Sequence, residues 1–291
     1  MTKKRKQAAI GILFALPTLL GLIIFKIYPI LASGFYSLTE YHITLPPQWI
    51  GVKNYKNLFS DPLFIKSFSN TLYYLIWLVP LGLIVGICLA LLLVKDIKGI
   101  GFFRSMVYLP SIVPIYAFAT VALWFFNPYF GLVNGLLARV GVEGPLWIAD
   151  EKWVKFTLVL VAQWGAGPTA LLFMAGMKDV PKELYEAATL DGANAWQKFW
   201  KITFPFISPI TLYYLITSAI GALQFFDLPN IMTGGGPNNA SLSVGMYIYR
   251  HAFRYTNMGY ACAMSWIIFI ISLILTIVLL RTSMKWVFYG E

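Results

Sequence analysis

The chain has 291 residues, of which 59% are hydrophobic and 12% are charged, and its mean hydropathy is +0.71. A soluble domain carries about a quarter charged residues, so this composition argues against a soluble enzyme and predicts an all-α polytopic membrane protein. The net charge of +10 would suit a nucleic-acid-binding protein. However, the basic residues form short clusters between apolar runs, which is the pattern of membrane topology. We therefore expect the lipid bilayer, and no nucleic acid, as a partner.

The first apolar run extends from Ala8 to Leu31 and follows a basic cluster at residues 3–6. A cleaved signal peptide is the alternative interpretation, but its apolar core would have about 7–15 residues. Because this run is longer, we expect an uncleaved first span with a cytoplasmic N-terminus. Pro17 and Lys26 predict an irregular helix in which the Lys26 amine reaches the outer interface.

Five further apolar stretches are long enough to cross a hydrocarbon core of about 30 Å. They cover residues 68–94, 105–126, 154–177, 206–226 and 260–280. An even number of spans places the C-terminus in the cytoplasm, and Lys and Arg are more frequent in the segments assigned to that side. The prediction is one transmembrane domain over residues 1–291 with six spans.

Three segments fall on the outer side in this topology. Residues 33–66 are aromatic and rich in turn signals, and residues 131–140 could form a short helix lying flat on the membrane. The glycine-rich residues 233–237 lack the preceding strand and the following Gly-Lys-Ser/Thr of a phosphate-binding loop. We expect a flexible outer loop there.

Residues that carry chemistry are scarce. Cys88 and Cys262 lie inside apolar runs, and His42 and His251 are the two histidines. This distribution has neither the spacing of a metal site nor that of a disulfide framework. The sequence also has no nucleophile elbow and no Walker-type phosphate loop. We therefore expect no catalytic residue, metal or cofactor on this chain.

A charged segment, residues 178–205, separates the fourth and fifth apolar stretches and has the pattern of a helix, a turn and a second helix. Pro181 suits the first turn of a helix, and Glu183 lies near the positive end of its dipole. Asp191-Gly192 is a turn signal, because glycine can take the positive φ that ends a helix. Asn194 can then cap a second helix. Residues at helical spacing follow at Trp196, Phe199, Trp200 and Thr203.

The residue order in this segment resembles the Glu-Ala-Ala loop of ATP-binding-cassette (ABC) import permeases. The matching positions are Glu186, Ala187, Ala188, Asp191, Gly192, Ala193, Phe199, Ile202 and Pro205. The resemblance covers about residues 12–281. Signals at residues 51–62 and at residues 235–237 make it similar to the carbohydrate-uptake type. It implies the permease subunit of a binding-protein-dependent importer, in which this loop is a cytoplasmic coupling helix seated in a groove of an ATPase.

The resemblance also implies partners and a location. The permease would pair with a second homologous permease, two cytoplasmic ATPase subunits and an extracytoplasmic solute-binding protein in the bacterial cytoplasmic membrane. ATP and Mg²⁺ would bind the ATPase, and the solute would be a sugar or a glycerol phosphate. The alternative for Glu186 and Asp191 is a solvated surface. The implied ATPase-coupling residues are Glu183, Glu186, Ala187, Ala188, Asp191, Gly192 and Phe199.

Polar side chains inside the spans predict a path for the solute, because lipid does not tolerate such groups. Amide, hydroxyl and aromatic groups are those that a sugar site needs. A helix break expected at residues 165–168 would have to be buried in protein or face a cavity. The alternative is interhelical hydrogen bonding and an aromatic belt. The candidate path residues are Gln163, Trp164, Ser218, Gln224 and Phe225.

Two other function classes make different demands on the sequence. An ion-coupled secondary transporter would need carboxylates within the spans as a relay, and the spans hold almost none, with Asp227 at an edge. A membrane-embedded enzyme would need acids or histidines clustered in the loops on one side. Neither pattern is present, so the sequence favours the importer.

Overall fold

The computed structural model describes residues 3–288, with side chains from residue 11 onward. Contacts divide the chain into two compact units. The first comprises the residues up to Asp61 together with Ile248–Ile267, and the second comprises Pro62–Tyr247 together with the residues from Ile268 onward. The single domain expected over residues 1–291 stays a prediction.

The described helices include segments for all the predicted spans. Four helices are long and apolar enough to cross a bilayer, and two bent helix pairs bring the number to six if each pair is one span. This result agrees with the all-α fold predicted from the sequence. The four unbroken segments are Gly11–Ser37, Pro62–Leu93, Ala195–Leu223 and Met258–Ser283.

The first unit begins with one continuous helix that ends at Ser37 rather than at the expected Leu31. Lys26 lies in a π-helical turn between two α-helical stretches. The helix is therefore irregular at Lys26, as the sequence predicted. The elements are α1 (Lys3–Leu22), η1 (Ile23–Ile27) and α2 (Tyr28–Ser37).

Hydrogen bonds order the aromatic segment that follows in the first unit. The buried Asn54 side chain donates to the carbonyls of Ser37 and Thr39, both at 2.9 Å. The Trp266 indole donates to the Ser33 hydroxyl at 3.2 Å, which joins α2 to the first part of α15. The elements are β1 (Thr39–Glu40) and β2 (Gln48–Trp49), which pair antiparallel, α3 (Lys53–Ser60), η5 (Arg250–Arg254) and α15 (Met258–Ser283).

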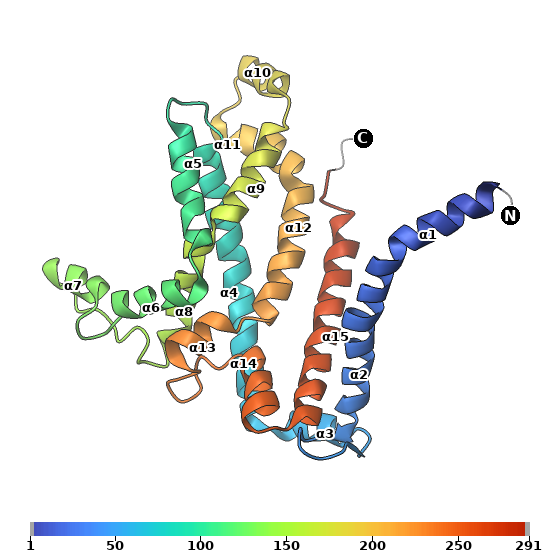
Figure 1. Ribbon diagram of the computed structural model, residues 1–291. Helices are drawn as coiled ribbons and strands as arrows, with labels where there is room; N and C mark the ends of the chain where they lie inside the picture. The colour runs from blue at the N-terminus through green and yellow to red at the C-terminus, as the bar shows by residue number, and fades with distance from the viewer. Residues whose placement is uncertain (1–2, 289–291) are drawn as a thin grey trace. The chain divides into compact units, whose positions relative to one another are not determined.

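Three helices form the core of the second unit: α4 (Pro62–Leu93), α9 (Gly167–Lys178) and α12 (Phe204–Leu223), which lie side by side (Figure 1). Glycines in α4 allow this approach, because a Cβ at Gly82 would overlap the Tyr214 hydroxyl. That hydroxyl donates to the Val79 carbonyl at 3.2 Å.

The predicted span at residues 105–126 is not one continuous helix. It consists of two helical pieces bent by 97°. The break is at Val113, whose backbone is extended, immediately before Pro114. A residue that precedes proline is driven out of the helical region, and proline has no N–H to continue the helix. The pieces are α5 (Ile100–Tyr108) with η2 (Leu109–Ile112), and α6 (Ile115–Phe125).

The predicted break at residues 165–168 is confirmed, because the fourth span bends by 53° there. Gly167 also lies so close to α5 that a Cβ at this position would overlap the Val107 carbonyl oxygen. The break therefore brings two helices into backbone contact. The pieces are α8 (Val154–Ala162) with η3 (Gln163–Gly165), and α9.

The glycine-rich residues 233–237, where a flexible loop was expected, are followed by a segment that hydrogen bonds attach to α4. The buried Asn70 side chain of α4 donates to the carbonyls of Asn239 and Leu242, each at 3.0 Å. Lys66 donates to the Asn238 carbonyl at 2.6 Å. These partners are more than 160 residues away in sequence, and the flexibility expected of residues 233–237 stays a prediction. In the chain this segment lies between α13 (Asp227–Thr233) and α14 (Val244–Tyr249), and a further helix of the second unit is α7 (Leu132–Arg139).

Candidate functional site

Residues 178–205 form the predicted helix-turn-helix at one end of the second unit (Figure 1), and we call this segment the elbow. Its first helix is α10 (Lys182–Leu190), and Pro181 is its N-cap residue. Gly192 has φ +78°, and the Ala193 amide donates to the Ala188 carbonyl at 2.9 Å. This is the helix-ending pattern that glycine favours.

The second half of the elbow starts a helix with a reciprocal cap. The backbone N–H of Gln197 donates to the side-chain oxygen of Asn194, and the backbone N–H of Asn194 donates to the side-chain oxygen of Gln197, both at 2.9 Å. This arrangement satisfies two amides that the first turn of a helix leaves without partners. The helix then continues through α11 (Ala195–Lys198) and η4 (Phe199–Thr203) into α12.

Two hydrogen bonds close the elbow on itself. The hydroxyls of Tyr185 and Thr203 are 2.8 Å apart, and the Lys198 amine donates to the Thr189 hydroxyl at 2.7 Å. Both bonds join α10 to the helix that follows the turn. The elbow is therefore a folded element rather than a loose connection.

The predicted coupling residues divide by exposure. Phe199 and Ala188 are half-buried, and the Phe199 ring contacts Trp196, Trp200 and Phe204 at centroid distances of 5.1–6.5 Å. The others form an open surface of carboxylates and small residues. These exposed residues are Glu183, Glu186, Ala187, Asp191 and Gly192.

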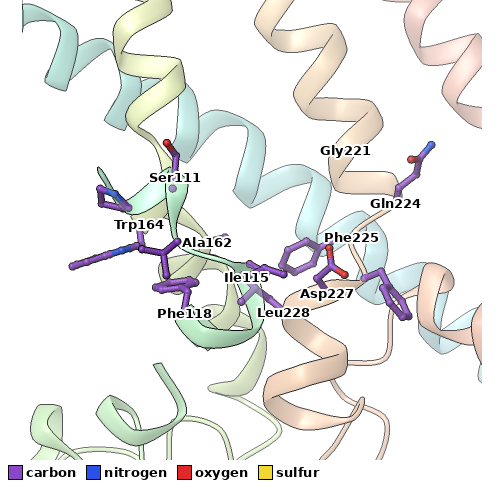
Figure 2. Close-up of a pocket in the computed structure, with 14 residues that line it drawn as sticks. Ser111, Ile115, Phe118, Ala162, Trp164, Gly221, Gln224, Phe225, Asp227 and Leu228 are labelled. Atoms are coloured by element: carbon purple, nitrogen blue, oxygen red, sulfur yellow. The ribbon is translucent and has the colours of Figure 1, made fainter. Parts of the chain in front are cut away.

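At the other end of α9 and α12, three interruptions of helices surround a cavity of about 560 Å³ (Figure 2). They are the bend before α6, the bend before α9, and the end of α12 at Leu223. Broken helices at membrane depth are tolerated where they are buried in protein or line a cavity. The cavity is therefore a place in this unit where a polar solute could be accommodated.

Three of the five predicted path residues line the cavity: Trp164, Gln224 and Phe225. The Trp164 side chain is 61% exposed and stacks on Phe118, with ring centroids 6.1 Å apart and planes 12° apart. Figure 2 places this aromatic pair on one side and Phe225 with Asp227 on the other. The cavity thus combines aromatic faces with a carboxylate, whereas the Gln224 side chain points away from these groups in Figure 2.

The other two predicted path residues do not line this cavity. The Gln163 amide donates to the Val159 carbonyl of its own helix at 3.0 Å, and its oxygen lies 3.4 Å from where a Cβ at Gly82 would be. Gln163 therefore faces α4. The Ser218 hydroxyl is buried and makes no hydrogen bond of normal geometry within residues 3–288.

Sequence reasoning missed the contribution of Ser111 and Phe118 to the cavity, and it gave Asp227 no role in the path. The prolines at positions 110 and 114, which flank Ser111, could have indicated the bend. The cavity wall at Phe118 had no local signal, because it depends on the angle between two helices.

The elbow and the cavity are connected by two helices. α9 has 12 residues and begins beside the cavity at Gly167, whereas Ala195–Leu223 is an unbroken helix of 29 residues that ends beside it. At a rise of 1.5 Å per residue these helices are about 18 Å and 43 Å long. The two helices therefore form continuous connections between the elbow and the residues beside the cavity.

Among the residues that the structure describes, no group of three His, Cys, Asp or Glu side chains could hold a metal ion.

Known proteins resemble this chain over most of its length. Residues 78–287 match the family described as the binding-protein-dependent transport system inner membrane component. The probable ABC transporter permease protein YesP of Bacillus subtilis is 36% identical, covering 98% of this chain and 94% of the relative. The arabinooligosaccharides transport system permease protein AraP of Bacillus subtilis is 34% identical, with coverage of 93% and 87%.

A third relative, the trehalose/maltose transport system permease protein MalF of Thermococcus litoralis, is 33% identical, with coverage of 96% of this chain and 95% of the relative. Among solved structures, a bacterial ABC transporter involved in the import of the acidic polysaccharide alginate has the same fold. Its chain matches with a TM-score of 0.86 at 23% identity over 99% of both chains. The chain therefore belongs to the family of membrane permeases of binding-protein-dependent ABC transport systems.

Proposed function

We propose that the chain is the membrane-spanning permease subunit of an ATP-driven importer for a sugar or a related small polar solute. The observation that carries this proposal is the pair of helices that joins the elbow to the cavity. Family membership and relatives named for arabinooligosaccharide and for trehalose and maltose transport support the solute class. The path would be lined by Trp164, Gln224 and Phe225, while Gln163 packs against α4.

In the proposed assembly, other subunits provide the rest of the path, the delivery of the solute and the hydrolysis of ATP. A second homologous permease would complete the path, and an extracytoplasmic solute-binding protein would deliver the solute. A related alginate transporter has been seen in complex with its periplasmic protein. Two cytoplasmic ATPase subunits would bind ATP and Mg²⁺, so this chain would not be an enzyme itself.

In this proposal the elbow faces the cytoplasm, and both termini lie on that side of a bacterial cytoplasmic membrane. The exposed Glu183, Glu186 and Asp191 offer carboxylates to cations or backbone donors of the ATPase, and the small Ala187 permits close approach. ATP-driven movement of the ATPases would shift the elbow, and α9 and α12 would transmit the shift to the cavity. Alternating access would then be a population shift driven by a ligand of the partner.

The test is a charge reversal on the elbow, Glu186→Lys, in the transporter purified with its native partners and reconstituted in liposomes. We expect normal membrane insertion and continued ATP hydrolysis, with uptake of radiolabelled sugars reduced at least tenfold. The control is Glu143→Lys, which places the same charge change at a different exposed residue, outside the elbow and the cavity. Normal uptake in Glu186→Lys would contradict the coupling role.

A further inference from the structure

The cavity between the helix breaks has no basic residue in its lining, although the protein has a net charge of +10. Of the 14 residues that line it, Asp227 alone carries a charge, and the set contains no lysine, arginine or histidine. The cavity wall formed by this chain is therefore formally negative, whereas the chain as a whole is positive.

Asp227 is in a position to act on a solute. It is the first residue of α13, and its side chain is exposed. In Figure 2 the Asp227 carboxylate lies beside Phe225, on the wall across from Trp164 and Phe118. A solute resting on the exposed face of the Trp164 indole would thus have this carboxylate within the same cavity.

A carboxylate in such a place has two opposite effects on solutes. It accepts hydrogen bonds from hydroxyl groups, and hydrogen bonds to an ionised acceptor are stronger than neutral ones. It also repels an anion, and the repulsion grows as water is excluded, because the effective dielectric constant falls. A neutral polyol gains from the first effect, whereas a uronate, a sulfonate or a phosphate ester is penalised by the second.

We propose that Asp227 is a specificity-determining residue that makes the cavity favour neutral, hydroxyl-rich solutes over anionic ones. This inference rests on the proposed function, in which the cavity is the solute path. The sequence left a sugar and a glycerol phosphate as possible solutes, and this inference favours the neutral sugar. The competing explanation is that Asp227 serves only the helix dipole at the start of α13, in which case the cavity has no charge preference that depends on it.

The charge preference can be measured without knowing the natural solute. Gly221 and Gly165 both line the cavity, and a Cβ added at either would meet nothing within 4 Å. Gly221→Cys and Gly165→Cys therefore supply reporter thiols in full-length chain whose native Cys88 and Cys262 are replaced by alanine. In membrane vesicles holding the assembled transporter, the thiols are treated with a trimethylammonium-ethyl or a sulfonatoethyl methanethiosulfonate. Each rate is divided by the rate with free 2-mercaptoethanol.

We expect the normalised cation-to-anion ratio to exceed one by roughly tenfold at both reporters, as one unit charge acting across a small cavity would produce. Asp227→Asn should lower the ratio to about one, while Asp227→Glu should preserve it. Glu143→Gln, which removes an exposed carboxylate that does not line this cavity, should leave it unchanged. A ratio that Asp227→Asn does not change would overturn the role of Asp227 and leave the solute path intact.

A neutral reagent separates the two proposals. If methyl methanethiosulfonate fails to reach both reporters in the assembled transporter, small solutes do not enter the cavity. That result would overturn the solute path together with the role of Asp227. Reaction of both reporters with the neutral reagent, combined with a ratio that depends on Asp227, supports both.

Discussion

The elbow and the cavity are held together by different kinds of contact. In the elbow, the glycine turn at Gly192, the reciprocal cap at Asn194 and the bond between Tyr185 and Thr203 connect residues at most 18 positions apart. In the cavity, the walls come from residues 110–118, 162–165 and 221–228. Their positions depend on backbone contacts between helices, such as that of Gly167 with Val107.

This difference predicts how each region responds to damage. A change in the elbow alters a local turn while the bundle of α4, α9 and α12 stays packed, so the main effect should fall on coupling. A change at a helix contact beside the cavity displaces an element that holds the wall, so the main effect should fall on stability. Single substitutions can test this division.

The largest expected effect is that of Gly167→Ala. The added Cβ would overlap the Val107 carbonyl oxygen, and a backbone atom cannot move aside as a side chain can. We expect a loss of about 3 kcal/mol in the free energy of unfolding, the upper part of the usual range for overpacking. Denaturant titration of the purified protein in detergent measures it.

The matched control for this prediction is Gly165→Ala, two residues earlier, where a Cβ meets nothing within 4 Å. Its free energy of unfolding should stay within about 0.5 kcal/mol of the unmodified chain. Equal losses in both variants would mean that the helix contact does not hold the cavity wall.

A smaller loss of stability with a large loss of function is expected for Gly192→Val. Gly192 has φ +78°, and a residue with a Cβ pays about 1–2 kcal/mol in this region. The turn would relax to another conformation and reorient α10, so uptake should fall while insertion and ATP hydrolysis continue. Assays of solute uptake and of ATP hydrolysis on the same liposomes measure whether the two activities are separated.

Gly135→Ala is the control for the turn, because Gly135 lies in α7 with ordinary φ and open space around it. It should leave uptake unchanged. If Gly192→Val transported normally, the conformation of the turn would be irrelevant to coupling, and the elbow would have to act through its side chains alone.

The two regions also differ in how far sequence could predict them. The turn at Gly192 and the cap at Asn194 were predictable, because each depends on the conformational preference of one residue and on neighbours within a few positions. The break at residues 165–168 was predictable for the same reason. These features need no knowledge of the rest of the fold.

Sequence reasoning failed where the local structure depends on contacts with segments far away in the sequence. The break at Val113 was missed because an apolar run of the right length outweighed the signal of Pro114. Asn70, which holds the segment after α13, is more than 160 residues from its acceptors. Gln163 was predicted to face the path because it is polar and within a span. It faces α4 instead, beside Gly82, and the position of that helix cannot be read from the residues around Gln163.

The smallest expected effect is that of Asn194→Ala, which removes the cap of the second elbow helix. Loss of such a cap costs about 1 kcal/mol, which corresponds to roughly a fivefold rise in local opening. Hydrogen exchange of the amides at residues 195–198 should accelerate by that factor. Asn194→Ser, which keeps a capping oxygen, should restore most of the protection.

Uptake should nevertheless stay within about twofold of normal in Asn194→Ala. The helix that starts at Ala195 continues for 29 residues, and the bond between Tyr185 and Thr203 still holds α10 against it. A small change in fraying at its first turn would then leave the connection to the cavity intact. A severe loss of uptake would show instead that the first turn itself contacts the moving partner, and the surface assigned to coupling would have to extend from α10 to Asn194.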